Sequence, residues 1–200
     1  MDTFVEDIIL KSSSAEVYGY QSKEFIFMEG ERPQYYFQII EGEVKLSNYG
    51  EDGKEIIQDI LEEGDSFGEF MLFMDKVYPV NAIAITNCRI LKIDKSKFMS
   101  MMERNPGIYE KMISSISNAM YFKFVMGQVI SSQNPASKLI VLLDYMKSLQ
   151  KNTERFSFKV PLTRQQMASL TGLCVETTIR TIKNMEKEKI IKICNRKIFY

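Results

Sequence analysis

The sequence contains no histidine among its 200 residues. Histidine is the commonest metal ligand, a haem ligand and the usual general base, so its absence argues against metal-dependent and acid–base enzyme chemistry. No glycine-rich phosphate loop, nucleophile elbow or paired-carboxylate site stands out either. We therefore expect a protein that is not an enzyme, with no catalytic residue and no bound metal.

Cysteine and long apolar runs are also scarce. The three cysteines, Cys88, Cys174 and Cys194, have neither the spacing of a disulfide framework nor that of a metal site, so we expect reduced thiols. No run of about 18 apolar residues occurs, and the acidic start MDTFVEDII lacks the basic region and apolar core of a signal peptide. The sequence predicts a cytoplasmic protein with no membrane partner.

The composition is that of an ordinary globular protein, with 45% hydrophobic and 26% charged residues, but the charge is unevenly divided. Residues 1–133 hold 13 Lys and Arg against 21 Asp and Glu, a net charge of −8. Residues 134–200 hold 13 against 5, a net charge of +8. This basic C-terminal segment is suited to a phosphate backbone, although basic faces also serve acidic proteins and lipids.

Residues 162–191, LTRQQMASLTGLCVETTIRTIKNMEKEKII, predict two short helices joined by a glycine turn. Thr163 and Gln166 have the spacing of a capping box, so the first helix is expected to begin at Thr163. Gly172 stands where a tight turn requires positive φ or a close helix approach. The second helix is expected to begin near Cys174. This pattern is typical of a helix-turn-helix DNA reader.

One face of the second helix carries Glu176, Arg180 and Lys183, which fall at i, i+4 and i+7. An arginine in the major groove can bridge O6 and N7 of guanine, and a glutamate can accept from N4 of cytosine. The alternative is an ordinary solvated ion pair between Glu176 and Arg180. The capping box, the turn glycine and the basic segment favour base reading. The residues expected to pack inward are Thr178, Ile182 and Met185.

The first hundred residues consist of short β-rich runs, namely EFIFMEGE, YYFQIIEGEVKLSNYG, EDGKEIIQDILEEGDSFGEF and AIAITNCRILKI. Strands at this spacing predict an all-β sandwich or barrel. The expected turn residues are Gly30, Gly42, Gly53 and Gly64. Near the C-terminus, KIIKICNRKIFY predicts a two-stranded wing with Asn195 and Arg196 at its tip.

Helical periodicity extends from Pro106 to Ser132, and Asn134 and Pro135 then begin another helix that runs through Lys138–Ser148. The long apolar stripe fits a coiled-coil seam between two copies of the chain. The alternative is a single core helix that packs on its own sheet. The predicted seam residues are Met112, Ile116, Ala119, Phe122, Met126 and Val129.

The order of these parts resembles the Crp/Fnr family of transcription regulators. The resemblance spans roughly residues 25–200 through EGERPQYYFQIIEGEVKL, EDGKE, EEGDSFGE, NPGIYEKM and LTRQQMASLTGLCVETTIR. It implies an α+β fold with an N-terminal β-roll or jelly-roll sensor domain at 1–104, a dimerisation helix at 105–133 and a C-terminal winged helix-turn-helix at 134–200. It further implies a homodimer that binds double-stranded DNA at promoters.

The resemblance assigns base reading to Glu176, Thr177 and Arg180. The segment VET at Val175–Thr177 is closest to the Fnr branch, which implies TTGA-like half-sites in a palindrome. Ile179 departs from the family pattern and is expected either to meet a thymine methyl or to pack inward. Contacts with the phosphate backbone are expected from Thr163, Arg164, Gln165, Lys183, Arg196 and Lys197.

The effector is where the sequence departs from the family. Members that bind cyclic AMP hold the phosphate with Gly-Glu followed by Arg-Ser, whereas Tyr78 and Pro79 stand at the Arg-Ser positions here. A phenol and a proline ring cannot replace a bidentate guanidinium, which argues against cyclic AMP. An iron-sulfur cluster needs N-terminal cysteines and haem sensing relies on His, so neither cofactor is expected.

A small apolar or aromatic effector is one reading of the remaining residues, and a collapsed core is the other. The candidate pocket consists of Gly68, Glu69, Phe70, Tyr78, Pro79, Val80, Lys123 and Phe124. Cys174, at a helix N-terminus beside basic residues, is a candidate oxidant sensor or simply a tolerated cap residue.

Two further alternatives stay open from the sequence. The acidic tip formed by Glu51 and Asp52 matches a loop that faces RNA polymerase in the family, or it is a solvated hairpin tip. The rival function from another class is a β-roll module that binds a protein partner and whose basic tail binds nucleic acid without sequence preference.

Overall fold

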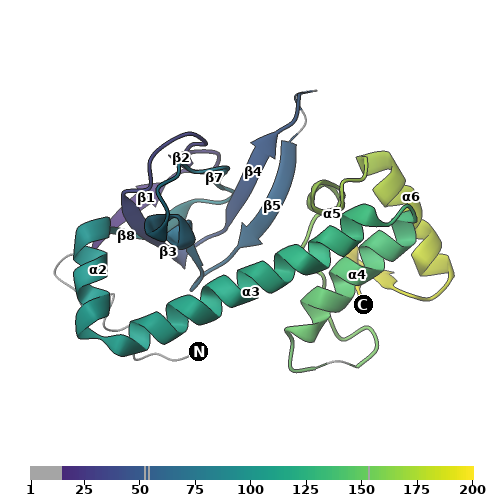
Figure 1. Ribbon diagram of the computed structural model, residues 1–200. Coiled ribbons are helices and arrows are strands. Elements are labelled where there is room, and N and C mark those ends of the chain that lie inside the picture. The colour runs from purple at the N-terminus through teal and green to yellow at the C-terminus, as the bar shows by residue number, and fades with distance from the viewer. Residues whose placement is uncertain (1–14, 52, 54, 153) are drawn as a thin grey trace. The chain divides into compact units, whose positions relative to one another are not determined.

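The computed structural model describes residues 15–51, 53, 55–152 and 154–200 (Figure 1). The chain folds as two compact units, divided between residues 118 and 119. The division falls inside the long helix α3, Pro106–Ser131, which therefore contributes residues to both units.

The first unit is built on two four-stranded sheets in which every described strand pair is antiparallel. One sheet has the order β1 (Glu16–Tyr20), β8 (Cys88–Asp94), β3 (Tyr35–Glu41) and β6 (Ser66–Phe67). The other has the order β2 (Phe25–Phe27), β7 (Asn81–Ala84), β4 (Val44–Tyr49) and β5 (Glu55–Leu61). This confirms the predicted β architecture, and β1 is a strand that the sequence patterns did not indicate.

Side chains from both sheets form the core of the first unit. Three phenylalanine rings pack together there. Between ring centroids, Phe27 lies 5.8 Å from Phe37 and 6.0 Å from Phe67, and Phe37 lies 5.4 Å from Phe67. Around them pack buried aliphatic residues, including Ile39, Val44 and Ile90. The predicted turn glycines all have positive φ, and at Gly42 a Cβ would lie only 2.6 Å from the carbonyl oxygen of Asn87. Glycine is required at that turn for space as well as conformation.

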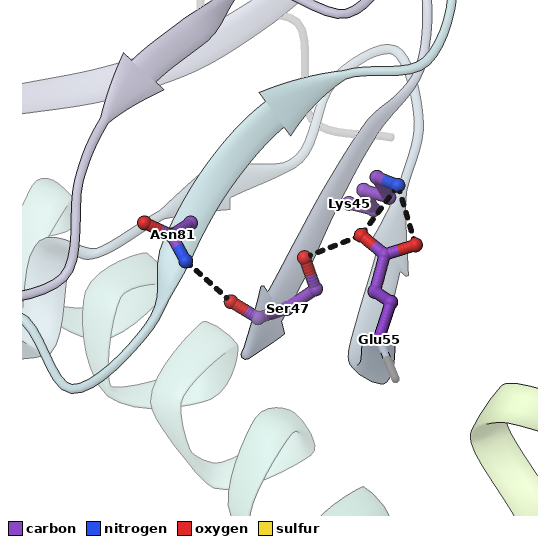
Figure 2. A network of polar contacts seen from close by, with 4 residues as sticks. All are labelled: Lys45, Ser47, Glu55 and Asn81. Atoms are coloured by element: carbon purple, nitrogen blue, oxygen red, sulfur yellow. Dashed lines mark hydrogen bonds and ion pairs between the residues drawn. The ribbon is translucent and has the colours of Figure 1, made fainter. Parts of the chain in front are cut away.

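A polar network joins three strands of the second sheet (Figure 2). The Lys45 ammonium on β4 lies 2.5 and 2.7 Å from the two carboxylate oxygens of Glu55 on β5. The hydroxyl of Ser47 donates to the same carboxylate at 2.8 Å, and the Asn81 amide on β7 donates to the Ser47 carbonyl at 3.2 Å. The network ties β4 to both neighbours beside its register shift at Leu46/Ser47.

Helical elements cover the first sheet. The short 3-10 helix η1, Glu69–Phe73, and helix α2, Lys95–Arg104, precede α3. The carboxylate of Asp94 caps α2 by accepting from the amides of Ser96 and Lys97, and these bonds, with one from the Ser96 hydroxyl, lower the pKa of Asp94. A second apolar cluster contains Tyr36, Leu72, Leu91, Ile93, Phe98, Met102, Ile108 and Met112.

Helix α3 has the predicted extent, but its apolar stripe faces its own chain. Met112, Phe122, Met126 and Val129 are all at most 7% exposed. Ile116 is half-buried against the cluster that contains Met112, and Ala119 is exposed. The burial of Met112, Phe122, Met126 and Val129 within the single chain favours the alternative of a core helix for these four residues, and the dimer seam stays a prediction.

The second unit contains α4 (Pro135–Ser148), α5 (Arg164–Thr171), α6 (Val175–Lys187) and the hairpin β9 (Lys192–Cys194) and β10 (Lys197–Phe199). Asn134 caps α4 and Pro135 occupies its first turn, as predicted. All three helices and the hairpin contribute buried side chains to this unit. Its buried residues include Leu139, Leu142, Leu143, Met167, Leu170, Ile182, Met185, Ile191 and Ile198.

Candidate nucleic-acid interface

Helix α5 begins and ends as the sequence predicts. The amide of Thr163 donates to the Gln166 side chain at 2.7 Å, and the Gln166 amide donates to the Thr163 hydroxyl at 3.2 Å, so both halves of the capping box form. Gly172 ends the helix in the left-handed conformation, with φ of 66°. The Lys138 ammonium also donates to the Thr171 carbonyl at 3.2 Å, which ties α4 to the C-terminal end of α5.

Helix α6 is strongly two-sided. Thr178, Thr181, Ile182 and Met185 are buried, whereas Glu176, Arg180 and Lys183 are exposed. Among the residues that the structure describes, no ion pair joins Glu176 to Arg180, although they stand one turn apart. Ile179 is half-buried. The exposed face therefore presents a carboxylate and two cations on a helix held firmly by its opposite side.

The N-terminus of α6 is capped by a thiol. Cys174 Sγ accepts from the amide of Thr177 at 3.4 Å and donates to the Thr177 hydroxyl at 3.0 Å. Serine, threonine, aspartate and asparagine are the usual residues at this position. The sequence patterns placed the helix start here but did not indicate the contact between the two side chains.

The hairpin after α6 is the predicted wing. Its turn residues Asn195 and Arg196 have φ of 48° and 63°, which is the pattern of a type I′ turn. The amide of Val160 donates to the Ile198 carbonyl at 2.9 Å, so a third segment pairs with the hairpin. Arg196 and Lys197 are exposed.

Most of the candidate backbone-contacting residues lie at the ends of helices or strands. Thr163 and Gln165 are exposed and Arg164 is half-exposed, all at the N-terminus of α5, where free amides and the helix dipole favour anions. Together with α6 and the wing, they give the second unit a set of basic side chains and hydrogen-bond donors. The predicted residues Lys183, Arg196 and Lys197 belong to the same unit.

Comparison with known proteins identifies the family that has this arrangement of domains. A family model described as a Crp-like helix-turn-helix domain matches residues 137–199, and one described as a cyclic nucleotide-binding domain matches residues 19–105. The chain belongs to the Crp/Fnr family of transcription regulators. The regulator thus joins a DNA-binding unit to a β-roll of the cyclic nucleotide-binding type.

Curated relatives cover most of this regulator. The cAMP-activated global transcriptional regulator CRP of Salmonella typhimurium is 25% identical over 181 residues, which cover 90% of this chain and 86% of that protein. The transcriptional activatory protein AadR of Rhodopseudomonas palustris is 27% identical over 178 residues, which cover 87% of this chain and 72% of that protein. Both are transcription regulators and not enzymes.

Solved structures share the fold of the regulator at low sequence identity. A mutant of CooA from Carboxydothermus hydrogenoformans has a TM-score of 0.83 at 15% identity, covering 100% of this chain and 91% of that chain. The c-di-GMP responsive global regulator CLP of Xanthomonas campestris has a TM-score of 0.76 at 16% identity, covering 100% and 98%. These matches support the α+β fold inferred from the sequence.

The β-roll of the regulator has aromatic rings where a nucleotide phosphate would need donors. Gly68 has φ of 71°, and a Cβ at this position would lie 3.1 Å from the rings of Phe27 and Tyr78. Those rings stack at 3.8 Å between centroids and belong to the buried core. A phosphate requires a cation or hydrogen-bond donors, and the stacked ring faces of Phe27 and Tyr78 supply neither.

The other candidate pocket residues differ in exposure. Glu69 is buried beside Gly68, whereas Phe70 and Pro79 are exposed and Val80 is half-buried. Lys123 and Phe124 are exposed on α3 and belong to the second unit. Within the first unit, Gly68 and Tyr78 lie together, and Val80 packs against the same core.

Burial affects the ionisation of two groups in this region. Desolvation raises the pKa of the Glu69 carboxyl, which is 3% exposed and accepts a bond from Ser115 at 3.4 Å. Desolvation also raises the pKa of the Tyr78 hydroxyl, and Glu31 and Glu69 add to that effect. Among described residues neither the Tyr78 hydroxyl nor the second oxygen of Glu69 has a hydrogen-bond partner.

Replacing Glu69 by glutamine should stabilise the regulator at neutral pH. The folded state holds the Glu69 proton more tightly than the unfolded state, whose pKa is about 4.3. The stability that this proton confers is present at low pH and is lost as pH rises through the raised folded pKa. In urea unfolding from pH 4 to pH 8, the unfolding free energy of Glu69→Gln should rise relative to that of the parent as pH rises.

The matched control is Glu63→Gln, which removes an exposed carboxylate from the same unit. Its unfolding free energy should follow the parent at every pH. If the unfolding free energy of Glu69→Gln also matched that of the parent at every pH, burial of the Glu69 carboxylate would not cost stability.

Several other sequence predictions concern parts of the chain away from this interface. Asp52 lies outside the described residues, and Glu51 is an exposed turn residue. The three cysteines are unpaired. Within the described part of the chain, no cluster of His, Cys, Asp or Glu could hold a metal ion, and no helix is long and apolar enough to cross a membrane.

Proposed function

We propose that the regulator binds a palindromic promoter site as a homodimer, with α6 of each copy in the major groove. The observation that carries this proposal is the two-sidedness of α6, which exposes Glu176 and Arg180 while the opposite side is buried. Recognition helices of this class contact base edges through their N-terminal residues. Glu176, Thr177 and Arg180 would therefore read bases, in half-sites that resemble TTGA.

Backbone contacts would fix the register of the dimer on DNA. The N-terminus of α5 presents Thr163, Arg164 and Gln165, and the wing presents Arg196 and Lys197. Lys183, one turn beyond Arg180, would contact the phosphates at the edge of the groove. Because each neutralised phosphate releases counterions, affinity should fall steeply with salt.

The proposed dimer uses the exposed side of α3. Ile113, Met120 and Phe124 are each more than half exposed, and with Ser117 they follow the four-three-four spacing of a coiled-coil seam. Gly127 continues the same spacing, and a Cβ there would meet no atom of the chain within 4 Å. This stripe lies beside the buried stripe on the helix, one or two residues along the sequence, and it leaves large apolar side chains for a partner to cover.

Control of the regulator would come from an effector other than a cyclic nucleotide, or from none. The stacked rings of Phe27 and Tyr78 beside Gly68 support this proposal. We further propose that the regulator acts in the cytoplasm. Contact of the Glu51 hairpin with RNA polymerase and oxidant sensing by Cys174 stay predictions.

Selection of DNA from a random pool tests the function directly. The purified protein, without added ligand and at near-physiological salt, should recover a palindrome with TTGA-like arms. Recovery of no motif, together with equal affinity for unrelated sequences, would favour the rival reading of a β-roll interaction module with a basic tail.

A further inference from the structure

The threonine hydroxyls of the helix-turn-helix are used in different ways. Thr171, Thr178 and Thr181 each donate to the carbonyl four residues earlier, at 2.7, 3.1 and 2.8 Å. These bonds occupy their hydroxyl protons inside the helices. Thr177 differs, because within the described residues its hydroxyl accepts a hydrogen bond from Cys174 and donates none to a protein atom.

The position of Thr177 explains this difference. Thr177 is the third residue of α6, so the carbonyl four residues earlier belongs to Leu173 and precedes the helix cap. Its hydroxyl therefore lacks a helical carbonyl four residues earlier of the kind that the other three threonines bond. The thiol of Cys174 contacts that hydroxyl at 3.0 Å and also accepts from the Thr177 amide at 3.4 Å. These two contacts hold the Thr177 side chain on one side of the helix terminus.

A hydroxyl has one proton and two acceptor lone pairs. When the thiol proton of Cys174 occupies one lone pair, the Thr177 proton is directed away from Cys174 and remains available. Thr177 is partly exposed and lies next to Glu176 on the first turn of α6. The first turn is the part of a recognition helix that reaches base edges.

We propose that Cys174 is a positioning residue that orients the Thr177 hydroxyl as a hydrogen-bond donor to DNA. This inference rests on the proposed function of α6 as a DNA reader. The acceptor on DNA is a base-edge oxygen or nitrogen, such as guanine O6 or N7 or thymine O4, or a phosphate oxygen. Both sources offer the same chemistry, and binding to variant sites distinguishes them.

The test compares four variants on the DNA site selected by the parent protein, at a temperature where all of them are folded. Thr177→Val removes the hydroxyl and keeps the shape, and we expect it to weaken binding by about three- to tenfold. Cys174→Ala should weaken binding by a similar factor. Cys174→Ser retains both a cap and a proton, so its affinity should stay within about twofold of the parent. The control Cys194→Ala removes the other exposed thiol and should have no effect.

The double variant C174A/T177V decides whether Cys174 acts through Thr177. It should bind no more weakly than Thr177→Val alone, because the orienting contact has nothing left to orient. Additive losses would overturn the proposal, and so would parent-like binding by Thr177→Val. If Thr177→Val weakens one substituted base pair selectively, the acceptor is a base, and if it weakens all sequences alike, the acceptor is a phosphate.

Failure of this inference and failure of the proposed function have different signatures. If the parent protein selects no site, α6 is not a DNA reader. If the parent selects a site and Arg180→Ala relaxes it while the Cys174 and Thr177 variants do not change affinity, only the positioning role is lost.

Discussion

Phe124→Glu should convert the regulator from a dimer to a monomer. Phe124 is 64% exposed in the single chain and belongs to the exposed α3 stripe with Ile113 and Met120. In a two-fold coiled coil a seam residue meets the same residue of the partner or its close neighbours. The substitution would remove two apolar side chains from the seam and place two carboxylates close together.

The expected effect is large because the apolar side chain is lost twice per dimer. Burial of a phenylalanine side chain is worth about 1.5–3 kcal/mol, so two contribute about 3–6 kcal/mol, before any charge repulsion is added. That energy corresponds to about a hundred- to ten-thousandfold increase in the dimer dissociation constant. Sedimentation equilibrium measures this directly, and affinity for the palindrome should fall while binding to a single half-site is retained.

Leu149→Glu is the matched control, since Leu149 is 66% exposed and lies just beyond the end of α4. It introduces the same carboxylate at an equally exposed apolar residue outside the α3 stripe. We expect the dimer dissociation constant of Leu149→Glu to equal that of the parent protein. A dimer that survived Phe124→Glu unchanged would show that this side of α3 is not the interface.

Arg180→Ala should relax the choice of base at one position in each half-site. Arg180 is exposed on α6 and, within the described residues, makes no ion pair with Glu176, so its guanidinium is available to bridge O6 and N7 of guanine. Loss of that bidentate contact should cost about 1–3 kcal/mol for the preferred base pair. The measurement is the dissociation constant for the selected site and for each single base-pair substitution.

Lys197→Ala provides the contrast, because Lys197 is exposed on the wing and is expected to contact phosphate. It should weaken binding to every sequence by a similar factor. The slope of log affinity against log salt concentration should also fall by the amount that corresponds to about one phosphate contact. If Arg180→Ala also weakened every sequence alike, base reading by α6 would be excluded.

Much of the DNA-binding unit follows from short-range chemistry. Thr163 and Gln166 form the capping box that their spacing indicates, and Gly172 has the positive φ that its place in the turn indicates. Asn134 and Pro135 begin α4 as expected. Such features are predictable because the interacting groups lie within four residues of one another, so the sequence contains both partners.

The two sides of α3 were not predictable in the same way. Both the buried stripe with Met126 and Val129 and the exposed stripe with Met120 and Phe124 repeat at three and four residues. Helical periodicity identifies an apolar side but not what covers it. Only the packing of the chain on itself showed which stripe is already covered.

The sequence by itself determined the β-rich first unit, the long helix, the helix-turn-helix and its wing, together with the polar face of α6. It did so because caps, turns and periodicity are local. The tertiary structure alone decided that the rings of Phe27 and Tyr78 stack beside Gly68, and that Glu69 is buried against Ser115 on α3. Those partners are separated by about fifty residues in the sequence, and only the folded chain brings them into contact.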